Sequence, residues 1–367
     1  MVTHPYDQQL QSNNNNNNNN GRRHSSHNEI TLQQTMGNST ICVFLDLCGA
    51  YNSVNISKLT HKLTEIGTPP YIALWIGSFF INKHYFDGIH SAVGNRGLDQ
   101  GSTISPLLFN IYTSHIGGLL GECKMSGFAD DFSIRAHGRD MVLEASKLQR
   151  ELDHLTFQFE EIDLQINPNK SKFMVFLPNR SRPSVIPILH IGQERIQLVE
   201  SHKYLGLTFD KDGNWNKHIE NVVNASSQDV TAMKFLKGSN WGNNPKTQLI
   251  LYKAVCRPKM EYASTIYLWK NDPALKKLQV IQNKALRHAL GAVRTTPVNS
   301  LHAASAVLPI RHRVDEISLK TTNKYCSTSP TISAQYHEMS CLPSRGRQEK
   351  IKQEIQFEGR EQYDIIS

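Results

Sequence analysis

Three aspartates stand at the ends of apolar, strand-like segments, and this placement restricts the fold more than any other feature of the chain. Asp46 directly follows the β-branched and aromatic run 41–45, which predicts a buried strand. Asp130 and Asp131 lie between two short apolar segments. Two such segments around a two-residue polar centre predict a β-hairpin with carboxylates at its tip.

Carboxylates in these positions need a counter-charge. Burying an isolated carboxylate is unfavourable, and two adjacent carboxylates repel each other. A divalent cation relieves both effects, because Mg²⁺ prefers hard oxygen ligands and its charge offsets theirs. Two such ions about 3.5–4 Å apart stabilise the attacking and leaving oxygens of a phosphoryl transfer. The alternative for the Asp130-Asp131 pair is a solvated turn, where Asp is common.

The charge balance bears on the kind of partner. The chain has 40 Lys+Arg against 32 Asp+Glu, a formal net charge of +8. This excess suits a polyanion, because each cation placed on a phosphate releases counterions, but a mildly basic soluble protein explains it equally well. The 6 cysteines include no CxxC pair and are typical of reduced intracellular thiols. No apolar run approaches the roughly 20 residues of a membrane span, so we expect no membrane partner.

The predicted elements divide the chain into an α/β part and an all-α part. We expect a disordered Asn-rich tail at 1–27, an α/β domain at 28–212, a helical region at 213–325 and a poorly structured tail at 326–367. Ser105-Pro106 resembles an N-cap and first turn, followed by an apolar stretch to residue 120. Periodicity predicts strands at 41–45, 124–129, 132–135, 173–177, 188–191, 195–198 and 204–209, and helices at 56–66, 70–80, 139–162, 217–237, 245–268 and 273–290.

Five segments, taken in order, resemble the motifs of non-LTR (LINE-type, Jockey-like) retrotransposon reverse transcriptases. They are FLDLCGAYNSV at 44–54, QGSTISPLLFN at 100–110, FADD at 128–131, LQINPNKSK at 164–172 and HKYLG at 202–206. Each motif alone is a weak signal, whereas five in the family's order are a specific one. Farther on, the stretch from Gln282 to Ile310 resembles the thumb and connector of Jockey-like elements.

The resemblance implies an α+β fold and an activity. The fold would be a polymerase palm with partial fingers, in which an antiparallel sheet carries helices on one face, followed by an all-α thumb or connector. The activity would be that of an RNA-directed DNA polymerase that extends a DNA primer on an RNA template with dNTPs. Two Mg²⁺ ions would serve as cofactors, with Mn²⁺ as the alternative ion. The resemblance places the protein inside the cell, in the nucleus or cytoplasm, and leaves its oligomeric state open.

The resemblance also implies residue roles. The metal ligands would be Asp46, Asp130, Asp131 and the backbone carbonyl of Leu47. The nucleotide pocket would contain Tyr51, Gln100, Gly101 and Ala129. Tyr51 would exclude a 2′-hydroxyl, with a core aromatic as the alternative reading. Lys170 would protonate or stabilise the leaving pyrophosphate, with a solvated lysine as the alternative. The primer would be held at a turn made by Lys203, Tyr204, Leu205 and Gly206.

Some positions depart from the family pattern. Asn52 stands where the family usually has Asp, and Asp99 stands where Pro usually precedes the Gln-Gly pair. Only 45 residues precede Asp46, so we expect an N-terminally truncated copy whose fingers are largely missing. A second hypothesis is therefore a catalytically inactive, nucleic-acid-binding remnant, which metal-dependent dNTP binding would distinguish from the enzyme. A third, a host-domesticated or maturase-like protein, fits the segment after Lys203 less well.

Overall fold

The computed structural model describes residues 29–30, 33–34, 36–81, 83–86, 91–118, 121, 123–178, 186–236, 244–268 and 271–328. The tail expected at 1–27 lies outside these residues, as does 329–367 of the tail expected at 326–367. Residues 326–328 belong to a helix instead. The chain divides into two compact units between His218 and Ile219, and each unit is described by itself.

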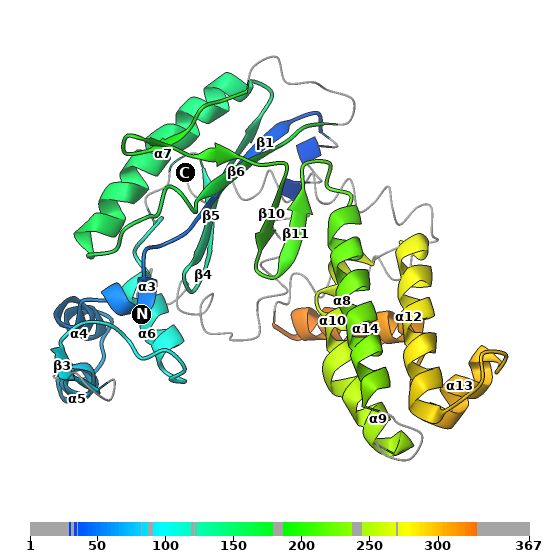
Figure 1. Cartoon of the computed structure of the whole chain (residues 1–367). Coiled ribbons are helices and arrows are strands. Elements are labelled where there is room, and N and C mark those ends of the chain that lie inside the picture. The colour runs from blue at the N-terminus through cyan, green and yellow to red at the C-terminus, as the bar shows by residue number, and fades with distance from the viewer. Residues whose placement is uncertain are drawn as a thin grey trace. The chain divides into compact units, whose positions relative to one another are not determined.

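The first unit is built on a five-stranded sheet with the strand order β4-β5-β1-β6-β9 (Figure 1). Its strands are β1 (Ser39–Leu45), β4 (Lys124–Phe128), β5 (Asp131–Gly138), β6 (Lys172–Phe176) and β9 (Gln197–Leu198). The central strand β1 is antiparallel to both of its neighbours, β5 and β6. The prediction of an antiparallel sheet is therefore confirmed except at one edge, where β9 is parallel to β6.

The two faces of this sheet are covered differently, because alternate residues of β1 point to opposite sides. Ile41, Val43 and Leu45 belong to the hydrophobic core, beside the long helix α7 (Met141–Glu161), which packs on β1 and β5. On the other face, Phe44 lies against His202, with ring centroids 4.7 Å apart. His202 belongs to the hairpin β10–β11 (Ser201–Tyr204 and Leu207–Asp210). A helix thus covers one face, and a two-stranded hairpin contacts the other.

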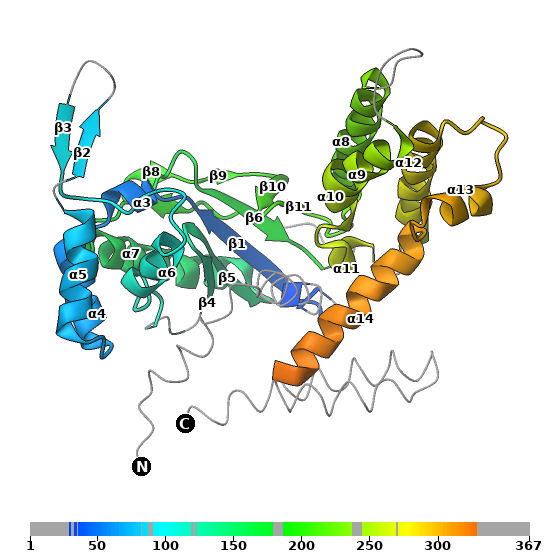
Figure 2. The ribbon, with the colours of Figure 1, turned by 90° about the horizontal axis from the view of Figure 1, so that it is seen from below.

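The other elements of the first unit are short. They are α3 (Ala50–Ser53), α4 (Ile56–Glu65), α5 (Pro70–Phe80), α6 (Ser105–Tyr112), β2 (Lys83–Phe86), β3 (Ser91–Gly94), β7 (His190–Ile191) and β8 (Glu194–Arg195). Helices α4 and α5 pack side by side, and the hairpin β2–β3 stands next to them (Figure 2).

Local sequence explains where the predicted helices of this unit begin. The Asn55 side chain accepts hydrogen bonds from the first turn of α4, and the Asp140 side chain does the same for α7. Pro70 is the first residue of α5, a position that needs no N–H donor. The helices predicted at 56–66, 70–80 and 139–162 are confirmed to within two residues.

Three expectations for this unit were wrong. Ser105 is the first residue of α6 and not its N-cap, which is Ile104, and α6 ends at Tyr112, well short of residue 120. The strand predicted at 204–209 is the two arms of a hairpin with a turn at Leu205-Gly206. The strand predicted at 195–198 is divided between β8 and β9.

The second unit is helical where it is described. Its helices are α8 (Asn216–Phe235, which begins in the first unit), α9 (Pro245–Leu251), the π-helical η1 (Tyr252–Cys256), α10 (Arg257–Glu261), α11 (Ser264–Tyr267), α12 (Asp272–Leu290), α13 (Val298–Ser305) and α14 (Ile310–Thr328). The helices predicted at 217–237 and 273–290 are confirmed. No described helix combines the length and the apolar character that a membrane span needs.

The continuous helix predicted at 245–268 is wrong. A π-turn occurs where Arg257 donates its N–H to the carbonyl of Tyr252, five residues back. Pro258 follows directly, and its ring would clash with the carbonyl four residues earlier in a regular α-helix, so the wider turn makes room for it. The helix then ends at Glu261. The chain turns through Ala263, whose φ of 53° is left-handed.

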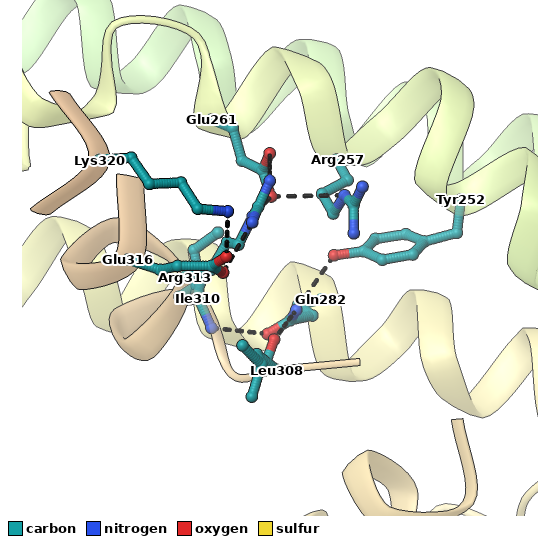
Figure 3. A network of polar contacts seen from close by, with 9 residues as sticks. All are labelled: Tyr252, Arg257, Glu261, Gln282, Leu308, Ile310, Arg313, Glu316 and Lys320. Atoms are coloured by element: carbon teal, nitrogen blue, oxygen red, sulfur yellow. Dashed lines mark hydrogen bonds and ion pairs between the residues drawn. The ribbon is translucent and has the colours of Figure 1, made fainter. Parts of the chain in front are cut away.

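A buried glutamine joins α12 to the start of α14 (Figure 3). The side chain of Gln282 is 1% exposed. Its Nε2 donates to the hydroxyl of Tyr252 at 3.1 Å and to the carbonyl of Leu308 at 2.9 Å. Its Oε1 accepts the N–H of Ile310 at 3.0 Å. The segment that resembles a thumb motif thus carries a structural hydrogen-bond network.

An ion-pair network lies beside it in the same figure. Arg313 bonds to Glu261 at 2.8 Å and to Glu316 at 2.7 Å. Glu261 also pairs with Arg257, and Glu316 with Lys320. These pairs connect the end of α10 to the first turns of α14.

Candidate active site

Asp46 and Asp131 occupy neighbouring positions at one end of the central sheet. Leu45 is paired with Phe132 in the antiparallel β1–β5 ladder. The ladder ends at this pair, and Asp46 and Asp131 are the residues that adjoin it. Asp130 is the next residue, in the turn between β4 and β5. The ladder therefore brings all three acids to the same end of the sheet, where Asp46 is half-buried and the other two are exposed.

The predicted hairpin with acids at its tip is confirmed. Phe128 pairs with Asp131, so Ala129 and Asp130 form a two-residue turn. Ala129 has a left-handed φ of 52°, whereas Asp130 is not among the residues with positive φ. This sign pattern is that of a type II′ turn, whose twist matches that of the flanking strands. A non-Gly residue with positive φ at this position carries a strain of about 1–3 kcal/mol that a Gly would not.

The backbone of Asp46 is held from the 165–171 segment. Its N–H donates to the Oγ of Ser171 at 3.1 Å. Its carbonyl accepts the N–H of Asn167 at 2.7 Å. The next residue, Leu47, forms an isolated antiparallel bridge with Ile166. Asp46 thus leaves the sheet in a defined backbone conformation.

Tyr51 stands between the core and the acids. It is half-buried and stacks on Phe109 of α6, with ring centroids 4.9 Å apart and planes 25° from parallel. Burial, followed by the carboxylate of Asp130, raises the pKa of Tyr51 above its ordinary value. The aromatic expected under the incoming sugar therefore lies within electrostatic reach of Asp130. Its stacking on the buried Phe109 also agrees with the core-aromatic reading.

The strand-like segment before the Gln-Gly pair is fastened to the Tyr51 region by main-chain contacts. Gly97 donates its N–H to the carbonyl of Val54 at 2.9 Å, and Leu98 donates to the carbonyl of Tyr51 at 2.8 Å. Gly97 has a φ of +88°, and a Cβ there would lie 3.0 Å from the Cα of Asn52. A glycine is therefore required at this position by both conformation and space.

Gln100 and Gly101 form the turn that follows, and both are exposed. Gly101 has a φ of +89°, and open space surrounds the position that a Cβ would occupy. The space beside Gly101 leaves room for a ligand to approach the backbone. The assignment of these two residues to a nucleotide pocket stays a prediction.

Lys170 is exposed on the turn that leads into β6. Its N–H donates to the Oδ1 of Asn167 at 3.3 Å. The turn is closed by the N–H of Ser171, which donates to the carbonyl of Asn167 at 2.9 Å. The lysine is thus carried by the same segment that holds the backbone of Asp46.

Of the four residues expected to form a turn, Leu205 and Gly206 do so, whereas Lys203 and Tyr204 end the strand β10. The turn belongs to a hairpin that reaches the acidic end of the sheet. Leu205 and Gly206 have φ values of 48° and 79°. Two consecutive positive values are the mark of a type I′ turn. Tyr204 donates from its hydroxyl to the carbonyl of Asp131 at 3.4 Å. Lys203 is exposed, and its contact with a primer stays a prediction.

Sequence reasoning assigned no role to Ser171, Gly97 or Phe109. Ser171 is wholly buried. In the sequence, the only indication of its role was that serine often closes a turn before a strand. Gly97 is recognised only through its close approach to Asn52, and Phe109 only through its stacking on Tyr51. These contacts join segments that lie far apart in the chain.

The donor set at this end of the sheet suits a hard cation. It comprises the carboxylates of Asp46, Asp130 and Asp131 and the carbonyl of Leu47, which are oxygen ligands of the kind that Mg²⁺ takes. Across the ranges that the structure describes, no three His, Cys, Asp or Glu side chains are grouped as metal ligands. The backbone thus places the acids together, while their side chains are not gathered around one point. In chemical type and backbone placement the residues fit the expected ion.

Comparison with known proteins supplies independent information. A family model described as reverse transcriptase (RNA-dependent DNA polymerase) matches residues 5–209. The probable RNA-directed DNA polymerase from transposon X-element of Drosophila melanogaster is 25% identical over 273 residues, which are 71% of this chain and 29% of that protein. The RNA-directed DNA polymerase from mobile element jockey of Drosophila funebris is 25% identical over 289 residues, covering 76% of this chain and 31% of that protein.

The Drosophila melanogaster jockey enzyme is 24% identical over 68% of this chain and 28% of its own length. This chain therefore spans less than a third of these curated relatives. Among solved structures, telomerase from Candida tropicalis in complex with a fragment of telomeric RNA aligns over 79% of this chain and 49% of its own, with a TM-score of 0.38 and 13% identity.

Proposed function

The chain belongs to the reverse transcriptase (RNA-dependent DNA polymerase) family, and we propose that it is an RNA-directed DNA polymerase of a non-LTR retrotransposon. The jockey and X-element enzymes to which it is similar agree with the predicted Jockey-like relationship. In this proposal the first unit contains the palm, with partial fingers, and the second contains the thumb or connector. The substrates are dNTPs, a DNA primer and an RNA template.

One observation carries the proposal. The β1–β5 ladder ends at the Leu45–Phe132 pair, so Asp46 and Asp131 each adjoin its last pair, with Asp130 beside them in the hairpin turn. The backbones of three acids from two segments that are distant in sequence thereby lie at one exposed end of a sheet. If Asp130 and Asp131 were only an ordinary solvated turn, no third acid would need to lie beside them. The arrangement supports a site in which Asp46, Asp130 and Asp131, with the Leu47 carbonyl, hold divalent cations.

Each further residue has a proposed task in nucleotidyl transfer. Mg²⁺, or alternatively Mn²⁺, would offset the charge that develops on the transferring phosphoryl group. Tyr51, braced by Phe109, would pack under the sugar of the incoming nucleotide and exclude a 2′-hydroxyl. The exposed amine of Lys170 would hold a proton for the leaving pyrophosphate.

The two turns have proposed tasks of substrate positioning. The nucleotide would lie against the turn at Gln100-Gly101 and the tip residue Ala129, where the open space beside Gly101 admits a ligand. The primer end would lie along Lys203, Tyr204, Leu205 and Gly206. The hydroxyl of Tyr204 would keep this hairpin in place relative to the acids through the Asp131 carbonyl.

A catalytically inactive nucleic-acid-binding remnant is the second candidate. The observation in its favour is that the acid side chains in the described ranges are not grouped as a metal site. The half-buried Asp99, next to the Gln-Gly turn, adds a negative charge that would oppose a triphosphate. Such a remnant would bind primer–template without extending it.

Primer extension on an RNA template separates the two candidates. Wild type, Asp130→Ala and the exposed control Asp212→Ala would be compared with Mg²⁺ and dNTPs, and again with EDTA. A polymerase extends the primer as wild type and as Asp212→Ala, and stops with Asp130→Ala or without the metal. A folded wild type that binds primer–template and fails to extend it would establish the remnant.

A further inference from the structure

The main chain of Asp46 lies at the point where β1 leaves both of its neighbours. The ladder with β5 ends at Leu45, and the ladder with β6 ends at Phe44. The N–H and carbonyl of Asp46 therefore need other partners, because unpaired main-chain polar groups away from water are unfavourable. The N–H finds one in the hydroxyl of Ser171 at 3.1 Å. That hydroxyl belongs to a side chain that is 0% exposed.

The partner strand bulges opposite Asp46. Phe44 pairs with Lys172 and Leu47 pairs with Ile166, so the partner segment is longer than the stretch of β1 that it faces. The surplus residues form the turn between Asn167 and Ser171. Bulges of this kind redirect side chains and are common beside active sites. Here the bulge supplies a side-chain hydroxyl and a main-chain N–H in place of the ladder partners that β1 has lost.

The two ends of this turn hold both polar atoms of the Asp46 backbone. Ser171 Oγ accepts the Asp46 N–H and donates to the carbonyl of Asn167 at 2.8 Å. Asn167 donates its N–H to the carbonyl of Asp46 at 2.7 Å. We call this pair of residues the 167/171 clamp. Ser171 uses its hydroxyl once as acceptor and once as donor.

The clamp also carries Lys170. Asn167 Oδ1 accepts the N–H of Lys170 at 3.3 Å, and the turn that displays the lysine is closed by Ser171. Asp46, proposed to hold a cation, and Lys170, proposed to hold a proton, are thus both bonded to the 167/171 clamp. Their backbones cannot shift independently while the clamp is intact.

We propose that Ser171 is a positioning residue of the polymerase site. Its hydroxyl fixes the Asp46 main chain against the Lys170 turn, so that the Asp46 carboxylate stays within reach of a cation shared with Asp130 and Asp131. This inference rests on the proposed function. The inference goes beyond the proposed function because Ser171 is a buried side chain that would touch neither the ion nor the substrate.

The matched variants are Ser171→Thr and Ser171→Val. They have nearly the same shape, and only Thr keeps a hydroxyl, so any packing strain from the added methyl group is common to both. Two readouts need no catalysis: Mn²⁺ affinity, measured by electron paramagnetic resonance of the free ion, and hydrogen exchange at the Asp46 amide. A third is the Mg²⁺ concentration for half-maximal primer extension.

We expect Ser171→Val to bind Mn²⁺ about three- to tenfold more weakly than Ser171→Thr, the effect of losing the hydrogen bond that the hydroxyl accepts from Asp46. The Asp46 amide should exchange faster in Ser171→Val, while the amide of Val43, deep in the ladder, stays protected to the same degree. The half-maximal Mg²⁺ concentration should rise by a similar factor. Primer–template affinity should be equal in the two variants.

Equal Mn²⁺ affinity and equal Asp46 exchange in Ser171→Thr and Ser171→Val would overturn the proposal, even if wild type is an active polymerase. Faster exchange at both Asp46 and Val43 in Ser171→Val would also overturn it, since the role of Ser171 would then be general stability. A wild type that never extends primers, with Ser171→Thr and Ser171→Val still differing in Mn²⁺ affinity, would refute the polymerase and retain the clamp. If neither variant folds, Ser171→Ala is compared with wild type by the same readouts.

Discussion

The hydroxyl of Tyr204 donates a long hydrogen bond, 3.4 Å, to the main-chain carbonyl of Asp131. The ring of the same tyrosine lies 5.1 Å, centroid to centroid, from that of Phe44 on the central strand. The buried side chain of Tyr204 thus connects the Leu205-Gly206 hairpin to β1 through Phe44 and to β5 through Asp131. Because Tyr204 contacts both, displacement of the hairpin would disturb the acidic end of the sheet.

Replacing Tyr204 with Phe removes this hydrogen bond, together with the hydroxyl's interaction with the Ser133 side chain, and keeps the ring. A net contribution of about 1 kcal/mol predicts a several-fold fall in the single-turnover rate of primer extension. Affinity for primer–template should change little. The exposed Tyr71 supplies the control, since Tyr71→Phe should leave the rate as in wild type. A Tyr204→Phe enzyme with an unchanged rate would show that the hairpin does not need this bond.

Alkaline pH should destabilise the first unit through its buried tyrosines. Burial raises the pKa of Tyr112 to about 12 and that of Tyr204 to about 12. The unfolded chain releases these protons near pH 10 and the folded chain near pH 12, so the free energy of unfolding falls across this interval. Denaturant titrations at pH 8, 10 and 11 measure the effect, and Tyr204→Phe should weaken the pH dependence.

Acidic pH should act through His218. Burial, followed by the charge of Lys203, lowers the pKa of His218 to about 4. Its Nδ1 accepts the N–H of Thr208, a contact that a protonated Nδ1 cannot make. The unfolded histidine binds its proton near pH 6.5, so stability is lost as pH falls from there towards 4. His218→Asn, which offers an acceptor that does not titrate, should flatten urea midpoints between pH 7 and 5.

Two glycines with the same backbone conformation should respond differently to alanine. Gly97→Ala combines backbone strain with a Cβ 3.0 Å from the Asn52 backbone, whereas Gly101→Ala has strain alone. We expect Gly97→Ala to lower the free energy of unfolding by about 2–4 kcal/mol and Gly101→Ala by about 1 kcal/mol. Thermal denaturation of both variants makes the comparison. Equal losses would mean that the Asn52 segment moves aside freely.

The second unit should depend on Gln282. Gln282→Leu leaves the Tyr252 hydroxyl and the Leu308 carbonyl without this partner, and each buried unsatisfied group is costly. The Ile310 N–H keeps a second acceptor, the Oε1 of Gln279 at 3.1 Å. We expect a loss of about 2–4 kcal/mol in the free energy of unfolding. The exposed Lys284 on the same helix gives the control Lys284→Leu, which should differ little from wild type. Retention of full stability by Gln282→Leu would contradict the network.

The parts of the fold that were predictable are those determined by local pattern. The apolar run before Asp46 and the apolar arms around Asp130-Asp131 carry the strand and the hairpin in their own residues. The N-caps at Asn55 and Asp140, where α4 and α7 begin, are likewise local. Of the site, the three acids were predictable, because Asp46 directly follows a strand and Asp130 and Asp131 lie at the tip of a hairpin.

The remaining features depend on partners that are distant in sequence. The hydrogen bond from Asp46 to Ser171 spans 125 positions and exists only because the intervening turn bulges. No periodicity reveals such a bulge. The break at Ala263 requires a left-handed alanine, which composition does not favour. Gly206 indicated a turn, but the apolar residues on either side of it favoured a single strand at 204–209 instead of the two strands of a hairpin.

The π-turn at Tyr252–Cys256 has a consequence for the alignment of the helices around it. A π-turn takes up one residue more than an α-turn, and each residue turns a helix by about 100°. The segment after it, Arg257–Glu261, is therefore rotated relative to the face that an uninterrupted helix would present. Glu261 meets Arg313 in that rotated setting, with 2.8 Å between Nε and the carboxylate. Deleting one residue between 252 and 256 would keep the helix nearly as long and as apolar, yet carry this carboxylate about a quarter of the way around the axis. The number of residues in this helix therefore sets the direction in which Glu261 projects. An insertion or deletion upstream within the same helix would change that direction.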